Sequence, residues 1–285
     1  MSADTSVHEH KVSPRETWTG AWLGGGILLL VIGCGLLSLV WTPHDPLAID
    51  VSAKFQPPSW THWLGTDQLG RDVLSMLMRG ALASITVSAV AVGLGMAVGV
   101  PLGMLAAKEQ GAIGTLVART SDLLFAFPAL ILAVLLRETL GPGVLNAAMA
   151  VGLFNVPVFA RVACGAALPV WGSQYVMAAR VSGRGGLWIA GLHVLPNMTN
   201  ALIVQVTIQL SLGILAEASL SYIGLGVQPP DPSWGRMLQE AQTLMALSPR
   251  LAIVPGLAIM ITVLGFNLLG ETLRKALDPR REHAA

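Results

Sequence analysis

The sequence predicts an all-α membrane protein with six transmembrane helices. Hydrophobic residues make up 53% of its 285 residues and charged residues only 12%, whereas a soluble domain carries about 25% charge. Mean hydropathy is +0.66. Several uncharged stretches reach the roughly 20 apolar residues that a spanning helix needs. Low charge and long apolar runs together indicate that most of the chain lies in a bilayer.

The first span is expected within residues 17–44, which contain no charged residue and have an apolar centre at 22–40. This run is too long for a signal peptide, and no clear small-x-small cleavage site follows it. We therefore interpret it as a retained helix that follows a polar tail, residues 1–20.

The segment between the first two spans, residues 41–79, is expected to begin as a loop because its first half is rich in proline. Asp67 is a suitable N-cap for a short helix from Arg71 to Met78. Such a helix would lie near the membrane interface and lead into the second span.

Five further spans follow from uncharged runs. They are residues 80–107, 123–136, 139–160, 197–216 and 251–270. The run at 123–136 is short and reaches spanning length only if Arg119 and Asp122 lie at the membrane surface. Residues 162–179 are also uncharged and could form a seventh span, although they contain Pro169 and a Gly-Ser-Gln sequence.

The second of the six spans carries Gly95, Gly99 and Gly103 at four-residue spacing. Glycines on one face of a helix let another helix approach closely. The stripe fits either packing within the chain or packing against another subunit.

Orientation follows from the placement of basic residues, since cytoplasmic loops are enriched in Lys and Arg. With the N-terminus inside, six spans leave eleven of the 17 basic residues on the cytoplasmic side. Both termini are therefore expected in the cytoplasm. A seventh span would move the basic C-terminus outside.

A polar segment, residues 161–197, is expected on the cytoplasmic side. Residues 175–182 can form a helix that glycines at 183, 185 and 186 would break. A second short helix is expected at 187–195, with Pro196 starting the next span. On the outer side, residues 224–250 contain three prolines and a possible short helix at 234–245.

The sequence contains no recognisable catalytic device. No lysine follows a glycine as in a phosphate-binding loop, and neither H-E-x-x-H nor G-x-S-x-G occurs. Cys34 and Cys164 are expected to be packing residues, and the His8 and His10 pair in the tail is expected to be incidental. The net charge of +1 excludes a nucleic-acid surface. We therefore expect no enzyme activity, no metal and no cofactor in this chain.

Glu217 stands out as a carboxylate within an apolar run, where charge is costly and tends to be functional. It could line a translocation path or gate together with Ser219 and Ser221. It could equally be a structural group that joins helices. A single acid makes a proton relay across the bilayer a poor interpretation.

Two sets of motifs resemble a known family. Met177-Ala178-Ala179, Gly183 and Val194-Leu195-Pro196-Asn197 resemble the cytoplasmic EAA motif of binding-protein-dependent ABC importer permeases. Residues 62–72, 216–226 and 277–279 resemble the dipeptide, oligopeptide and nickel branch, specifically its C-type permease. Met177 stands where that family usually has glutamate, which removes a charge from the motif.

The resemblance implies a type I ABC importer permease fold with a cytoplasmic coupling helix. Its parts would be a tail at 1–20, the first span and outer loop at 21–79, a core of five spans at 80–272 with a coupling segment at 164–198, and a cytoplasmic tail at 273–285. The ATPase-coupling residues would be Tyr175, Met177, Ala178, Ala179, Arg180, Gly183, Arg184, Leu195 and Pro196. The residues facing a binding protein would be Trp63, Asp67, Arg71, Asp72 and Trp234.

The implied function is transport of di- or oligopeptides across the inner (plasma) membrane. Nickel, metal chelates or opine-like solutes are alternatives within the same importer class. Partners would be a homologous second permease, two ATP-binding subunits that bind ATP and magnesium, and an external solute-binding protein. An ion-coupled secondary transporter and an intramembrane enzyme are the competing hypotheses. The first would transport solute without partners, and the second would need a buried nucleophile or metal set.

Overall fold

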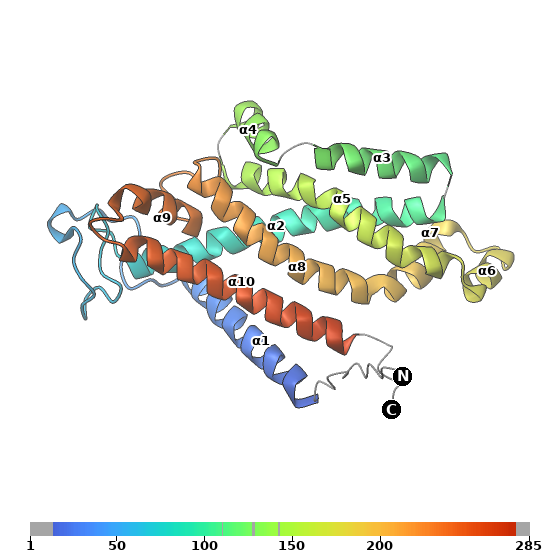
Figure 1. The fold of residues 1–285 in the computed structure, drawn as a ribbon, viewed down its shortest axis with the longest axis horizontal. Coiled ribbons are helices and arrows are strands. Elements are labelled where there is room, and N and C mark those ends of the chain that lie inside the picture. The colour runs from blue at the N-terminus through green and yellow to red at the C-terminus, as the bar shows by residue number, and fades with distance from the viewer. Residues whose placement is uncertain (1–13, 110, 127–128, 142, 278–285) are drawn as a thin grey trace, which may run out of the picture.

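The computed structural model describes residues 14–109, 111–126, 129–141 and 143–277. Within these residues the regular elements are helices, apart from one isolated bridge between Thr66 and Asp72. The helices form an elongated bundle (Figure 1). The short helix α6 lies at one end, and α9 lies at the other beside the loops that follow α1. We call these the α6 end and the α9 end.

The helices have these bounds: α1 Pro14–Leu37, α2 Val73–Lys108, α3 Ala112–Ala126, α4 Ala129–Leu140, α5 Val144–Trp171, α6 Gln174–Val181, α7 Gly186–Ile189, α8 Leu195–Tyr222, α9 Trp234–Ala241 and α10 Arg250–Ala276. A π-helical turn, Ala190–Val194, joins α7 to α8. The chain from Gly186 to Tyr222 is therefore one continuous helix.

Five described helices are long and apolar enough to cross a membrane: Thr19–Leu37, Val73–Lys108, Val144–Trp171, Gly186–Tyr222 and Arg250–Ala276. They confirm five of the six expected spans. The remaining one, at 123–136, contains residues 127 and 128, which lie outside the described residues. The helices α3 and α4, of 15 and 12 residues, lie on either side of them. Charged residues at 119, 122, 137 and 138 leave a short apolar stretch between them. The two helices together return the chain from the α6 end toward the α9 end (Figure 1).

The expected helix boundaries differ from the observed ones at three places. α1 begins at Pro14, so the end of the expected tail is helical. The expected helix capped by Asp67 is absent because Asp72 caps α2 instead, accepting a hydrogen bond from Ser75 N, and α2 then runs without a break. α5 continues to Trp171, so the polar segment is shorter than predicted. The eight-residue α6 is too short to be a seventh span.

The α2–α5 pair forms the centre of the bundle, and the glycine stripe lies between these two helices. A Cβ atom at Gly95, Gly99 or Gly103 would collide with the α5 backbone or side chains. A Cβ on Gly99 would lie 2.8 Å from the Phe159 Cβ. The stripe therefore serves packing within the chain, the first of the two interpretations above.

Helix α8 is tied to its neighbours by buried polar contacts that the sequence analysis did not single out. Gln209 Nε2 donates to Asn155 Oδ1 of α5 at 2.7 Å, and Ser88 Oγ of α2 donates to the Leu210 carbonyl at 2.9 Å. In a medium without water such bonds help to fix which helices pack together.

Candidate functional site

Helix α6 is held against the end of the bundle by one buried anchor. Val176 is fully buried and packs in a cluster that includes Trp171 of α5, Ile189 of α7 and Val194. The expected helix at 175–182 is confirmed as Gln174–Val181. Because it is anchored on one side only, α6 keeps its other side free for contact.

Gly183 ends α6 in a Schellman turn. The Gly183 N–H donates to the Arg180 carbonyl at 3.0 Å, and the Arg184 N–H donates to the Ala179 carbonyl at 3.1 Å. The Gly183 φ is +77°, a left-handed conformation that glycine adopts without a Cβ penalty. The expected glycine break is therefore present, and it fixes the angle between α6 and α7.

The surface around this turn is unusually apolar. Tyr175 and Met177 are exposed, as are Ala178 and Arg180. Two residues that the sequence analysis missed are more exposed still, because Val181 is 90% and Leu187 92% accessible. One feature of the sequence could have predicted them: both are apolar residues that flank the glycine break in a polar segment.

The basic residues of this segment lie beside a cavity. Arg184 stacks over the Trp188 ring at 4.6 Å, and Arg180 lies 5.3 Å from the Trp171 ring. Both arginines line a cavity of about 330 Å³ with Lys108 and Glu109. A hydrogen bond from Lys108 lowers the pKa of Glu109, with the Lys108 charge acting in the same direction. The cavity therefore presents three cations and one neutralising carboxylate.

An aromatic cluster supports α6 from the side of α7. The His193 ring lies 5.9 Å from that of Tyr175 and 5.1 Å from that of Trp188, both in edge-on arrangements. Trp188 and His193 were not predicted as site residues. Leu195 and Pro196 are exposed and lie in the first turn of α8, where the next span was expected to begin. The π-helical turn makes this start continuous with the short helix before it.

The α9 end is organised by a chain of charged residues. Arg71 donates from Nε to Asp67 Oδ2 at 2.6 Å and from Nη2 to Glu240 Oε2 at 2.5 Å. Arg236 Nε donates to the other Glu240 oxygen at 3.0 Å. Burial lowers the pKa of Arg71, but the Asp67 and Glu240 charges outweigh it and leave the pKa above its ordinary value. This network joins the loop before α2 to α9.

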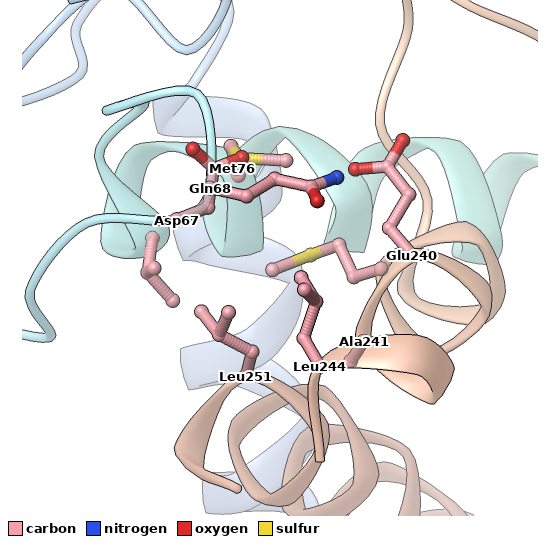
Figure 2. A pocket seen from close by; sticks show the side chains of 9 residues that line it. Asp67, Gln68, Met76, Glu240, Ala241, Leu244 and Leu251 are labelled. Carbon is pink, nitrogen blue, oxygen red and sulfur yellow. The ribbon is translucent and has the colours of Figure 1, made fainter. Parts of the chain in front are cut away.

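Figure 2 shows how little space remains in this region: Asp67, Gln68 and Met76 face Glu240, Ala241, Leu244 and Leu251 across a small pocket. Its cavity is about 20 Å³, room for about one water molecule. It is a packed junction and holds no space for a solute.

The tight Gly-Thr-Asp-x-x-Gly-Arg-Asp sequence has a local explanation. Asp67 Oδ1 accepts the backbone N–H groups of Leu69 and Arg71, both at 2.8 Å, and so closes the turn. Gly70 has φ +78°, and a Cβ there would collide with the Asp50 carbonyl. Arg250 Nη2 donates to the Thr66 carbonyl at 3.0 Å from the start of α10. The motif thus builds the loop itself.

This geometry corrects part of the expectation for the residues said to face a binding protein. Trp234 is only 2% exposed, and its Nε1 donates to the Leu77 carbonyl at 3.0 Å. Asp67 and Asp72 are also buried, because their oxygens serve the turn and the α2 cap. Trp63 alone of the five presents a largely exposed side chain.

Glu217 is completely buried where α8 meets α2 and the start of α9. Its Oε1 accepts a hydrogen bond from Ser221 Oγ at 2.6 Å, and Ser221 Oγ in turn accepts from Val227 N at 3.1 Å. The Ser84 and Ser233 side chains also lie near the carboxylate. Ser219 points elsewhere, to the Leu215 carbonyl. These contacts fit the structural role that the sequence analysis gave as one alternative. The role of Glu217, Ser219 and Ser221 in a translocation path stays a prediction.

A larger cavity of about 540 Å³ lies between α2, α3 and α5. Small residues make up most of its lining, and Arg161 and Asp122 form an ion pair of 3.1 Å beside it. Ligand pockets commonly have volumes of about 300–1,000 Å³. Glu217, Ser219 and Ser221 do not line it.

Curated proteins of similar sequence share nearly the whole chain. It is 39% identical over 279 residues to the glutathione transport system permease protein GsiD of Pectobacterium atrosepticum, covering 94% of this chain and 93% of the relative. It is 39% identical to the di/tripeptide transport system permease protein DppC of Pseudomonas aeruginosa, covering 92% and 89%. A GsiD of Escherichia coli O6:K15:H31 is 43% identical, covering 78% and 74%.

The fold also matches a solved structure. A chain of the MetNI methionine ABC transporter, crystallised in inward-facing conformations, superposes with a TM-score of 0.60 at 20% identity. The match covers 71% of this chain and 96% of that chain. A match at 20% identity shows the fold alone, which is that of a type I ABC importer permease.

The model of one protein family, described as binding-protein-dependent transport system inner membrane component, matches residues 99–283. This range includes α6, the Gly183 turn and the long helix through α8. The chain belongs to this family of inner-membrane ABC transporter permeases.

Proposed function

We propose that this chain is the C-type permease subunit of an ABC importer that carries short peptides across the plasma membrane. Di- and oligopeptides, including glutathione-like tripeptides, are the substrate class. The names of the GsiD and DppC relatives support this class over nickel, chelates or opines. Transport is driven by ATP that partner subunits hydrolyse, and this chain binds neither ATP nor magnesium.

The observation that carries the proposal is the apolar surface around the Gly183 turn. Val181 and Leu187 project almost fully into solvent beside exposed Tyr175 and Met177. Apolar side chains surrounded by basic ones are typical of an interface with an apolar centre and a charged rim. This surface receives an ATPase subunit, and α6 transmits that subunit's movement to the bundle through Val176.

In this proposal the α6 end faces the cytoplasm and the α9 end faces outward. The distribution of basic residues supports this orientation, which places both termini inside. A homologous permease pairs with this chain, two ATP-binding subunits dock at the α6 end, and a solute-binding protein docks at the α9 end. Trp60 and Trp63, which are 97% and 63% exposed, are the tryptophans of the outer loop placed to touch that protein.

The turn at Gly183 provides the direct test, and Gly185 provides a matched control. Both glycines have open space around them, but Gly183 has φ +77° while Gly185 has φ −67°. In the complex assembled with its partners, Gly183→Val should abolish peptide-stimulated ATP hydrolysis, because valine is strained at positive φ. Gly185→Val should keep it. Both variants should insert and purify normally.

Unchanged stimulation in Gly183→Val would remove the coupling role from this segment. Peptide uptake by the reconstituted chain without ATPase subunits would overturn the proposal as a whole. Competition of labelled glutathione uptake by dipeptides, tripeptides and nickel would assign the substrate class.

A further inference from the structure

Three potential metal ligands meet at the α9 end. They are His44 in the loop after α1, His62 in the loop before α2, and Asp72 at the start of α2. One ligand atom from each lies within 4.8 Å of the others. The residues are far apart in the sequence and form no recognisable ligand spacing, so only the folded chain brings them together. We propose that they form a binding site for a divalent transition-metal ion.

The distances suit a metal of that size. His62 Nδ1 lies 2.9 Å from Asp72 Oδ1, and His44 Nδ1 lies 3.8 Å from the same oxygen. Ligands about 2.0–2.1 Å from a tetrahedral ion are about 3.3 Å apart. The two separations from Asp72 Oδ1 lie on either side of this value. The third pair, between the two imidazoles, lies within 4.8 Å, so rotation of the histidine side chains would complete the site.

The donor types determine the class of ion. Two imidazole nitrogens and one carboxylate oxygen suit Zn²⁺, Ni²⁺ or Cu²⁺, whereas Mg²⁺ and Ca²⁺ prefer sites made of oxygen. Three protein ligands leave at least one coordination position for water or an external donor. Solvent reaches the cluster from the His44 side, because the His44 side chain is 42% exposed while those of His62 and Asp72 are 18% and 2% exposed.

The surrounding contacts position the ligands in advance. Asp72 Oδ2 accepts both the N–H and the hydroxyl of Ser75 at 2.8 Å, which leaves Oδ1 directed at the histidines. Ser75 Oγ also accepts the His44 backbone N–H at 3.0 Å. The His62 backbone is held by Ser59 on both its N–H and its carbonyl. Outer contacts of this kind typically orient metal ligands.

The consequence is a clamp on the loops at this end. A bound ion would join the end of the α1 loop, the loop around residue 62 and the first turn of α2. Without metal, the same atoms make a hydrogen bond between His62 Nδ1 and Asp72 Oδ1. The site does not depend on the transported solute, so its test is independent of the proposed function.

The experiment uses the full chain in lipid nanodiscs at pH 7.5, purified with a tag that contains no histidine, because metal affinity depends on pH. Zn²⁺, Ni²⁺ and Co²⁺ are titrated separately. Bound metal is counted after desalting, and the Co²⁺ absorption spectrum reports coordination. We expect one equivalent of tightly bound metal and a higher unfolding temperature with metal than with chelator.

His44→Ala is the decisive variant because it removes a ligand while the backbone contact to Ser75 can remain. It should weaken binding at least tenfold and abolish the metal-dependent rise in unfolding temperature, and His62→Ala should do the same. His193→Ala, at the opposite end, and a variant with both His8→Ala and His10→Ala should bind like the wild type.

Two results would overturn the proposal. One is a wild-type chain that retains no metal. The other is a binding stoichiometry that His44→Ala leaves intact and the His8 and His10 variant removes, since the metal would then reside on the tail. His62→Ala also removes the hydrogen bond to Asp72, so it can lower stability even in chelator. In that case the test uses His44→Ala alone, provided that this variant is as stable in chelator as the wild type.

Discussion

The two ends of the bundle differ in how far their side chains find partners within the chain. At the α9 end, Arg71 bridges Asp67 and Glu240, and the intervening cavity holds about one water molecule. At the α6 end, Val181 and Leu187 stand in solvent with nothing packed over them. Exposed apolar side chains that are grouped at one place commonly mark an interaction surface. The charged groups of the α9 end are therefore paired within this chain, although its outer loop also exposes Trp60 and Trp63. At the α6 end the exposed residues include apolar side chains at the turn itself, which a partner can cover.

The difference predicts that substitutions at the α9 end change stability and that substitutions at the α6 end change assembly. The largest effect is expected from Arg71→Met. It leaves two carboxylates without their shared cation and should lower the free energy of unfolding by about 3–5 kcal/mol. Denaturant unfolding in detergent measures this. Arg184→Met at the α6 end, where the arginine makes no ion pair among the described residues, should stay near the wild type; equal losses would erase the contrast.

A smaller loss is expected in the middle of the bundle, from Gly99→Ala. The new Cβ collides with Val156 and Phe159, so α2 and α5 must separate, at a cost of about 1–3 kcal/mol. Gly93→Ala is the matched control on the same helix, because a Cβ there meets nothing within 4 Å. The control should be neutral or slightly stabilising in the same unfolding measurement. A harmless Gly99→Ala would show that the stripe is not at a tight helix contact.

Glu217→Ala should have a comparable or slightly smaller effect. It removes the acceptor of the Ser221 hydroxyl in a fully buried place, which costs about 1–3 kcal/mol. Ser219→Ala, two residues away and exposed, should change stability by less than about 0.5 kcal/mol. Unfolding and peptide uptake are measured together. Loss of uptake with intact stability would instead assign Glu217 to the translocation path.

The smallest effect on stability, near zero, is expected from joint replacement of Val181→Ser and Leu187→Ser. Because these side chains pack against nothing, unfolding should change by less than about 0.5 kcal/mol. Affinity for the ATPase subunit should nevertheless fall about tenfold, as in the loss of an interface hot spot. Co-purification measures it. Leu247→Ser, an exposed apolar residue at the α9 end, should leave co-purification unchanged.

Much of the architecture could be predicted from the sequence because the bilayer imposes a simple rule. A helix that forms its own backbone hydrogen bonds crosses the bilayer only if it is long and apolar. Residues 80–107 and 251–270 could therefore be predicted as spans from their length and lack of charge. The rule is weakest at 123–136, where nearby charges shorten the apolar run; α3 and α4 lie on either side of residues 127 and 128, which are outside the described residues. The cap of the helix before the second span was predicted wrongly, because the sequence analysis chose Asp67 and only the folded loop shows that Asp72, five residues later, caps α2.

The turn in the polar segment could also be predicted from the sequence. Gly183 favours a left-handed turn through its local chemistry alone, whatever surrounds it. The sequence by itself thus determined five of the long apolar helices, the glycine break and the family motifs, all of which depend on neighbours along the chain. Tertiary structure alone decided that Trp234 and Glu217 are buried, that Arg71 pairs with Glu240, and that His44 meets Asp72. Those facts depend on contacts between residues distant in sequence, whose positions are set by the packing of whole helices.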